Sequence, residues 1–219
     1  MTELRSESFQ VPVGTHGHYV VEGPDSDEPL PLIVGFHGYA ENAEGHLEAL
    51  RRIAPRGWRL CGVQGLHAFY NRKSGEVVAS WMTRLNRELA IADNVAYVER
   101  VVAAVKQTHA TREPLVYVGF SQGVAMAYRA AAGAGHRCRA VVALGGDVPP
   151  DVAATDLSRF PRVLVGRGAE DPWYTEEKLA ADLAVLQGKG VEVEVCRFEG
   201  GHEWGDAFVA RARSFVEAL

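Results

Sequence analysis

The chain has 219 residues, of which 47% are hydrophobic, and its 28 acidic and 23 basic side chains give a formal net charge of −5. A chain of this length can bury one large core, so we expect a single domain over residues 1–219. Acidic and basic residues are interspersed, and no basic stripe of the kind that binds a phosphate backbone is present. Nucleic acid is therefore excluded as an expected partner.

Targeting and metal-binding signals are missing from the sequence. The segment from Met1 to Glu7 is charged and lacks the apolar stretch of a signal peptide. The longest uncharged stretch, from Leu115 to Tyr128, is too short to span a bilayer. Three cysteines, Cys61, Cys138 and Cys196, occur singly, without the spacing of metal ligands. We expect a cytoplasmic protein with no membrane span, metal or other cofactor, which is a monomer or a homodimer.

The first predicted elements are an antiparallel β-hairpin and a buried strand. Phe9 to Val13 and His18 to Val21 flank a glycine-containing turn, which predicts the hairpin. His16 and His18 near its tip suggest a metal site, but no third ligand accompanies them. A polar turn then leads to Leu32–Phe36, a continuous apolar run typical of a strand buried on both faces.

A helix and a strand follow, and then a segment without a clear pattern. The helix runs from about Ala43 to Ala54, and the strand from Leu60 to Val63. Residues 66–84 are rich in aromatic and charged side chains, and we expect them to be irregular. Apolar residues at helical spacing then predict a long helix from Glu88 to His109.

The second half of the chain alternates strands with helices. Strands are predicted at Leu115–Val118, Ala140–Leu144, Val163–Val165 and Val191–Phe198, and helices at Val124–Ala130, Thr175–Gln187 and Trp204–Ala218. This alternation implies an α/β fold with a mostly parallel central sheet and helices on both faces. Functional groups should gather at the carboxyl ends of the strands. Asp147 to Phe160 leaves room for a loop or one short helix, so we expect no cap domain.

The pentapeptide Gly119-Phe120-Ser121-Gln122-Gly123 lies between a predicted strand and a predicted helix. In that context G-x-S-x-G marks a nucleophile elbow, a tight turn that exposes the serine hydroxyl. The flanking glycines remove Cβ atoms that would block the turn, and the serine itself takes an unfavourable backbone conformation. We expect Ser121 to be a catalytic nucleophile.

A nucleophilic serine needs a histidine base and an acid that orients the histidine. In an elbow of this type the acid and then the histidine follow the serine along the chain. Two histidines follow Ser121. His136 lies at the far end of the helix that leads away from the serine, whereas His202 lies just past the last strand, where the loop opens towards the site. We therefore expect His202 to be the base.

The acid should lie at the end of an earlier strand. Asp171 has this position, and Pro172 stiffens the loop behind it. Glu170 is adjacent and Asp147 ends the preceding strand, so both remain alternatives. Asp171 is favoured because a short carboxylate on a rigid turn suits the binding of an imidazole N–H.

Two backbone amides are expected to stabilise an oxyanion. One is the amide of Gln122, at the N-terminus of the helix after the serine, where the helix dipole also helps. The other is the amide of Tyr39, in the loop that follows the strand Leu32–Phe36. His37 precedes the serine in sequence, and we expect it to brace this loop by hydrogen bonding.

These residues together resemble α/β-hydrolases of the carboxylesterase, phospholipase and acyl-protein thioesterase family. The resemblance spans nearly the whole chain and rests on G-F-S-Q-G at 119–123, H-G at 37–38, the acid Asp171 and G-H-E at 201–203. It implies a capless α/β-hydrolase fold and a Ser-Asp-His triad that acts on esters or thioesters without a metal. The sequence departs from the family's common H-G-L-G-D at residues 37–41, and from its W-F-D segment at residues 80–82.

The loops expected near the strand ends are rich in large side chains. We expect a substrate cleft lined by Trp81, Met82, Trp173, Phe69 and Trp204. Charged residues in the same region would either steer an anionic substrate or simply be solvated; these are Arg72, Lys73 and Arg84.

The leading hypothesis is a serine carboxylesterase that hydrolyses small-to-medium acyl esters through an acyl-enzyme, with thioesters and lysophospholipids as further substrates. An alternative is a dienelactone-hydrolase-like or carbon–carbon bond hydrolase on a small acidic substrate. The serine disfavours the dienelactone version, since that family normally carries cysteine at this position. A third hypothesis is a binding or receptor protein of the same fold with slow or no turnover.

Overall fold

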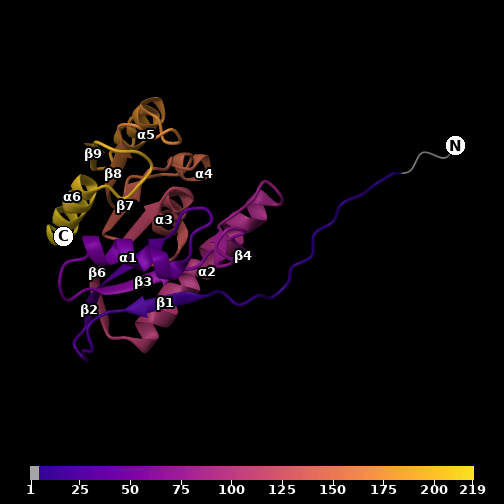
Figure 1. Cartoon of the computed structure of the whole chain (residues 1–219), viewed down its shortest axis with the longest axis horizontal. Coiled ribbons are helices and arrows are strands. Elements are labelled where there is room, and N and C mark those ends of the chain that lie inside the picture. The colour runs from indigo at the N-terminus through magenta and orange to yellow at the C-terminus, as the bar shows by residue number, and fades with distance from the viewer. Residues whose placement is uncertain (1–4) are drawn as a thin grey trace.

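The computed structural model describes residues 5–219. The segment Met1 to Glu7, in which we expect no signal peptide, therefore lies partly outside the described residues. A seven-stranded sheet forms the centre of the molecule, in the order β1-β3-β2-β6-β7-β8-β9 (Figure 1). Its strands are β1 (Tyr19–Glu22), β2 (Leu30–Phe36), β3 (Arg59–Val63), β6 (Thr111–Phe120), β7 (Ala140–Leu144), β8 (Arg162–Gly168) and β9 (Val193–Phe198). All neighbours are parallel except β1, which runs antiparallel to β3.

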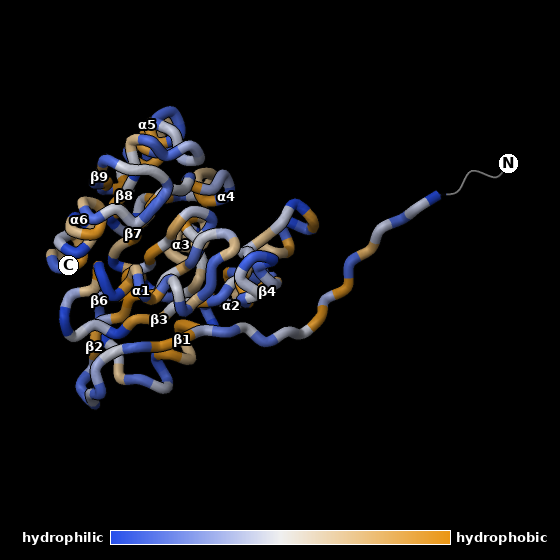
Figure 2. The backbone as a smooth tube through the Cα atoms, in the orientation of Figure 1, coloured by the Kyte–Doolittle hydropathy of each residue, from blue (hydrophilic) through white to orange (hydrophobic). Residues whose placement is uncertain are grey.

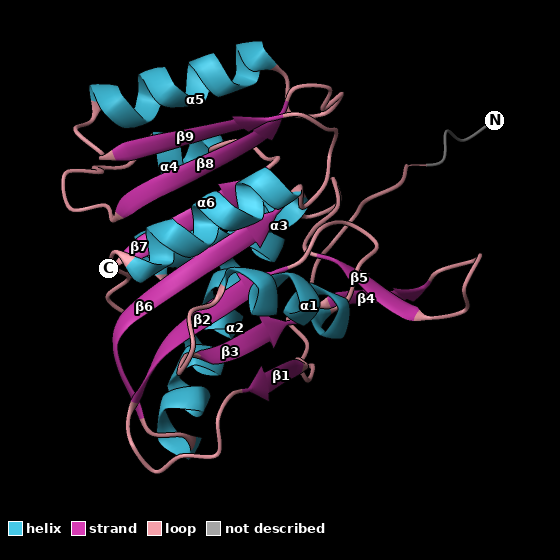
Figure 3. Ribbon diagram, turned by 60° about the vertical axis from the view of Figure 1, so that its left-hand side comes forward, coloured by secondary structure: helices cyan, strands magenta, loops and turns pink. Residues whose placement is uncertain are grey.

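Helices cover both faces of the sheet (Figure 3). They are α1 (Ala43–Ile53), α2 (Arg87–Thr108), α3 (Gln122–Gly133), α4 (Pro150–Ala153), α5 (Glu176–Gly188) and α6 (Asp206–Glu217). Helices α1 and α6 pack on one face, while the remaining four pack on the other. The expected α/β class, with its mostly parallel sheet, is confirmed.

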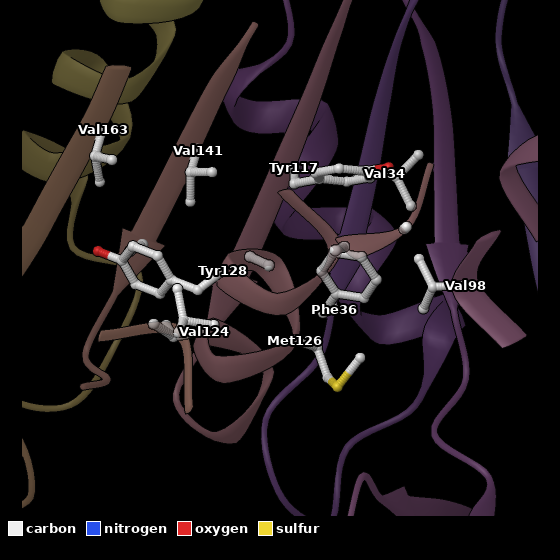
Figure 4. Close-up of a cluster of buried hydrophobic side chains, with 14 of the residues drawn as sticks. Val34, Phe36, Val98, Tyr117, Val124, Met126, Tyr128, Val141 and Val163 are labelled. Carbon is white, nitrogen blue, oxygen red and sulfur yellow. The ribbon is translucent and has the colours of Figure 1, made fainter. Parts of the chain in front are cut away.

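The inner strands are apolar on both sides because each side faces a helix layer. Along β2, Val34 and Phe36 point into the core beneath α2 and α3, whereas Ile33 points into the core beneath α1 and α6. Figure 4 shows the first of these cores, in which Tyr117 of β6 lies between the strands and the helices. Hydrophobic residues follow the central strands, and hydrophilic ones gather on the outer loops (Figure 2). This two-sided burial explains why the strands read as continuous apolar runs.

The N-terminal hairpin differs from the prediction. An antiparallel strand is present at the N-terminal side, but β1 pairs with β3, with Tyr19 opposite Val63, and not with residues 9–13. Residues 5–18 form no strand. The carbonyl of His18 still accepts from the hydroxyl of Tyr97, whereas the start of the segment extends away from the body of the molecule (Figure 1). A two-stranded hairpin alone is only marginally stable, whereas β1 gains the support of the whole sheet. The alternating residues Phe9, Val11 and Val13 are therefore exposed and pair with no strand within residues 5–219.

The segment 66–84 is also more regular than expected. It contains a separate antiparallel hairpin of β4 (His67–Tyr70) and β5 (Val77–Ser80). The hairpin is joined to the loop after β2, because Glu41 pairs with Ala79. The prediction of an irregular segment is therefore wrong, and the hairpin brings residues 80–82 next to the end of β2.

The carboxyl ends of the strands are left open. Between β7 and β8 the chain inserts only the four-residue helix α4, which agrees with the expectation of no cap domain. Within residues 5–219, no helix combines the length and the apolar character needed to cross a bilayer.

Candidate active site

Ser121 lies on the turn between β6 and α3, at the carboxyl edge of the sheet. Its backbone has φ 53° and ψ −120°, a conformation that non-glycine residues rarely adopt. The turn is held by the Ser121 amide, which donates to the carbonyl of Leu144 at 2.9 Å. A Cβ on Gly123 would lie 2.0 Å from the carbonyl oxygen of Phe36, so only glycine allows α3 to approach β2 this closely. The strained turn predicted from G-x-S-x-G is present.

His202 and Asp171 meet at the same edge, beyond β9 and β8. The Nδ1 atom of His202 lies 2.7 Å from Oδ2 of Asp171. The other oxygen, Oδ1, accepts from the amides of Trp173 and Tyr174 at 2.8 and 2.9 Å. Asp171 is only 4% exposed, so these bonds fix its carboxylate and, through it, the imidazole ring.

The alternative residues point elsewhere. Asp147 is exposed and forms an ion pair with Lys178 at 3.2 Å. Glu170 is exposed beside Asp171. His136 lies beyond the end of α3, where its Nε2 contacts the carbonyl oxygen of Glu99 at 3.0 Å. Of the histidine and acid candidates, the structure brings His202 and Asp171 together.

The two residues after β7, Gly145 and Gly146, lie against His202 and the Ser121 turn, respectively. A Cβ on Gly145 would lie 2.9 Å from Cε1 of His202, and a Cβ on Gly146 would lie 2.5 Å from the carbonyl oxygen of Ser121. On the other side, the ring of Phe120 lies 4.9 Å from the His202 ring, centroid to centroid. Gly145, Gly146 and the ring of Phe120 therefore pack between the Ser121 turn and the loop that carries His202.

The loop after β2 is braced by His37, as expected. This side chain is fully buried, and its Nδ1 donates to the carbonyl of Gly38 at 2.6 Å. Its Nε2 accepts from the amide of Gly65 at 3.0 Å, so the proton resides on Nδ1. Burial lowers the pKa of His37, which keeps the ring neutral. His37 therefore holds the loop between two strand ends.

The same loop presents an unpaired amide. Glu41 accepts from the amide of Gly38 at 2.7 Å, and Ala40 donates to the carbonyl of Ala79 at 3.0 Å. Within residues 5–219, neither the Tyr39 amide nor the Gln122 amide has a hydrogen-bond partner. Both donors are thus available to a ligand. Burial raises the pKa of Glu41, against the opposing effect of its bond to Gly38 and of nearby His202.

Gln122 also links the serine turn to residues 80–82 through its side chain. Its Oε1 accepts from the amide of Trp81 at 2.9 Å, and its Nε2 donates to the carbonyl of Met82 at 3.2 Å. The indole Nε1 of Trp81 in turn donates to the carbonyl of His37 at 2.9 Å. The indole is fully buried and packs edge-on against Phe36, with ring centroids 5.5 Å apart. Trp81 is therefore part of the core beneath the loop and does not line a cleft, contrary to expectation.

A cavity of about 320 Å³ opens beside Ser121. Met82 and Trp173 line it as expected, and Trp173 stands at the rim with 70% of its surface exposed. Phe69 packs on the ring of Tyr39 instead, at 5.6 Å between centroids. Trp204 packs against Phe120 and lines a second cavity.

Three cations on the wall of the cavity beside Ser121 were not anticipated from the sequence: Arg87, Arg129 and Lys178. No local motif marks them, since they come from three different helices. The charged residues singled out earlier, Arg72, Lys73 and Arg84, are exposed and do not line this cavity. Another hollow, of about 700 Å³, lies at the opposite ends of the strands, around Glu22, Arg59 and Ala110.

Comparisons with known proteins agree with this architecture. A family model described as Phospholipase/Carboxylesterase matches residues 16–219. No curated protein matches the sequence of this chain.

Several solved structures share its α/β-hydrolase fold. A carboxylesterase from Mesorhizobium loti is 23% identical with a TM-score of 0.74, over 93% of this chain and 95% of that one. YahD, solved with malic acid, is 16% identical with a TM-score of 0.72, over 93% and 99%. Acyl-protein thioesterase 2 from Zea mays is 15% identical with a TM-score of 0.70, over 93% and 99%.

Proposed function

The chain belongs to the phospholipase/carboxylesterase family and is thus an ester hydrolase, and we propose that it is a serine carboxylesterase that acts through an acyl-enzyme. The observation that supports this proposal is that the Ser121 turn and the His202–Asp171 pair lie at the same edge of the sheet, next to Gly146 and Gly145 respectively. Ser121 sits on a strained, half-buried turn, and His202 lies at the same edge of the sheet with its Nδ1 bonded to Asp171 at 2.7 Å. This is the arrangement that converts a weak hydroxyl into a nucleophile.

In the proposed reaction, the hydroxyl oxygen of Ser121 attacks the ester carbonyl carbon and passes its proton to His202. Because Nδ1 of His202 is bonded to Asp171, Nε2 is the nitrogen left to accept that proton. The negative charge that develops on the carbonyl oxygen is stabilised by the amides of Tyr39 and Gln122. His202 then protonates the leaving alcohol, and the acyl group remains on Ser121. Water, deprotonated by His202, releases the acid in a second attack.

The cavity supports a small-to-medium acyl group. Its volume of about 320 Å³ lies at the lower end of the range for small-molecule pockets. Met82 and Val148 provide apolar wall, and Trp173 stands at the open rim.

The test is the Ser121→Ala variant, assayed with p-nitrophenyl acetate and p-nitrophenyl butyrate. Removal of the nucleophile should lower kcat by about 10⁴- to 10⁶-fold, because the members of a triad act as a unit. Ser214→Ala is a matched control, since Ser214 is exposed on α6 and bonds only to a backbone carbonyl. A folded Ser121→Ala protein that hydrolyses these esters at the wild-type rate would refute the proposal.

Labelling with a fluorophosphonate distinguishes an enzyme from a binding protein of the same fold. The wild type should be labelled at Ser121 and should also turn over the esters. Labelling without turnover would favour the binding protein.

A further inference from the structure

We propose that the cavity beside Ser121 takes esters whose acyl group carries a second, free carboxylate, and that Arg87 binds this carboxylate. The inference rests on the proposed serine esterase function and names its class of substrate, the monoesters of dicarboxylic acids. It is carried by the charges on the cavity wall and by the way in which they are paired.

Two of the three cations on the wall are already neutralised. Arg129 is 2% exposed and holds both carboxylate oxygens of Asp151, at 2.8 and 2.7 Å. Lys178 bonds to Asp147 at 3.2 Å and to the carbonyl of Trp173 at 2.9 Å. These pairs tie α3 to α4, and α5 to the end of β7, and they leave few donors for a ligand.

Arg87 has no such partner. Within residues 5–219, no carboxylate lies within ion-pair distance of its guanidinium, and the one hydrogen bond of this group goes to the sulfur of Met82 at 3.1 Å. Sulfur is a weak acceptor, so most of the guanidinium N–H donors remain available. Asp151 neutralises Arg129 and Asp147 neutralises Lys178, so of the three positive charges on the wall only that of Arg87 is left unbalanced.

Asp151 is a negative charge near Arg87, but both of its carboxylate oxygens already bond to Arg129. The pKa of Asp151 is lowered mainly by its hydrogen bonds to Arg129, and the charge of Arg87 makes a smaller contribution. Because both oxygens of Asp151 face Arg129, an incoming carboxylate would meet the Arg87 donors without displacing an existing pair.

The position of Arg87 on its own helix is unfavourable without a ligand. It is the first residue of α2, where the helix dipole disfavours a positive charge. Asn86, just before it, has φ 52° and gives the helix no side-chain cap. An anion held by Arg87 would reverse this balance, since the guanidinium and the helix N-terminus would attract it together.

The shared cavity then indicates which part of the substrate is charged. Ser121, Gln122 and Arg87 all line this one cavity. A carboxylate at the far end of a short acyl chain can reach Arg87 while the ester carbonyl reaches Ser121. The planar guanidinium fork suits two-point binding of a carboxylate.

The test compares two esters with the same acyl chain and leaving group, mono(4-nitrophenyl) adipate, which carries a free carboxylate, and its neutral methyl ester, methyl 4-nitrophenyl adipate. The wild type should show a kcat/KM about tenfold higher for the anionic ester, as expected for a hydrogen bond between charged groups. Arg87→Gln should bring the ratio of the two values close to one, and Arg87→Lys should retain part of the preference. Arg84→Gln is the matched control, because Arg84 is a nearby exposed arginine that does not line the cavity, and it should leave the ratio unchanged.

The outcomes separate the inference from the function on which it rests. If the wild type hydrolyses the neutral ester at least as well as the anionic one, or if Arg87→Gln keeps the wild-type ratio, the inference is overturned and the esterase proposal stands. Suppose that the wild type hydrolyses neither adipate ester, and that it hydrolyses p-nitrophenyl acetate no faster than the Ser121→Ala variant does. Both the inference and the esterase proposal are then overturned. A preference that weakens in high salt supports an ionic contact.

Discussion

Replacement of Gly145 by alanine tests the closeness of β7 to the His202–Asp171 pair. Gly145 follows β7 with φ +67°, in the left-handed region. An added Cβ would lie 2.9 Å from Cε1 and 3.1 Å from Nδ1 of His202, and 3.3 Å from Oδ2 of Asp171. The methyl group would therefore push on the imidazole ring from the side of the cavity.

Two effects set the size of the change. The left-handed backbone conformation costs a non-glycine residue about 1–2 kcal/mol of stability. Carbon atoms in ordinary contact lie about 3.5–4.0 Å apart, so the ring must withdraw by roughly 0.5–1 Å. A misplacement of about 1 Å can lower the rate 10²-fold, so we expect kcat to fall by about 10- to 10²-fold.

The Gly57→Ala variant separates these effects. Gly57 has φ +79°, and nothing lies within 4 Å of the position that its Cβ would take. Both variants should lose a similar free energy of unfolding in urea, but only Gly145→Ala should lose kcat for p-nitrophenyl butyrate. Equal kcat values for the two variants would contradict the placement of His202 against Gly145.

Three further changes test the supporting structure. Trp81→Phe removes the indole bond to the His37 carbonyl and leaves that buried group unpaired, so it should cost about 1–3 kcal/mol in urea unfolding and lower kcat more than it raises KM. Burial lowers the pKa of His46 to about 3, so the unfolded chain binds a proton below about pH 6.5 that the folded protein excludes, and stability is lost as the pH falls towards 3. His46→Leu should therefore reduce the slope of unfolding free energy against pH by up to about 1.4 kcal/mol per unit between pH 6 and 4. Burial raises the pKa of Asp182 to about 6, so this residue has the opposite effect: its contribution to the free energy of unfolding falls as the pH rises from about 4 to 6. Asp182→Asn removes this contribution and should therefore make the slope of unfolding free energy against pH steeper. An unchanged slope in either variant would contradict the assigned burial effect.

The opposite signs at His46 and Asp182 have a consequence for the wild type. Between about pH 4 and 6 the unfolded chain gains a proton at His46 that the folded protein lacks, while the folded protein holds a proton at Asp182 that the unfolded chain has lost. The two slopes largely cancel, so the stability of the wild type alone conceals both groups. Only the single variants reveal them.

Sequence patterns predicted the sheet well because its strands are buried on both faces. Every predicted strand from Leu32 onwards and every predicted helix is present, with ends shifted by a few residues. The prediction of the N-terminal hairpin failed because a pattern within a short segment does not show which strand, elsewhere in the chain, the segment pairs with. Residues 9–13 alternate like a strand but form none, and β1 pairs instead with β3, which comes much later in the chain.

Candidate site residues divide in the same way. Ser121, Asp171 and His202 each follow a strand, and the parallel topology brings such positions to one edge. Whether a nearby aromatic lines the cleft or fills the core depends on contacts that the sequence does not display. Trp81 is buried because its indole N–H finds the His37 carbonyl, 44 residues away in sequence. Arg87 and Arg129 reach one cavity from different helices, and neither belongs to a motif.

The hydrogen bonds of Gln122 suggest why the residues around Trp81 depart from the family pattern without loss of the site. The Gln122 amide and the Tyr39 amide belong to loops that follow different strands, so their spacing needs an outside support. Gln122 fixes the backbone of Trp81 through its side chain, and Trp81 fixes the loop of Tyr39 through the His37 carbonyl. The two donors are therefore joined by one continuous path of hydrogen bonds. What this path requires is an indole N–H and a free backbone amide at position 81, so the identity of the following residue, Met82, is left free to shape the cavity wall.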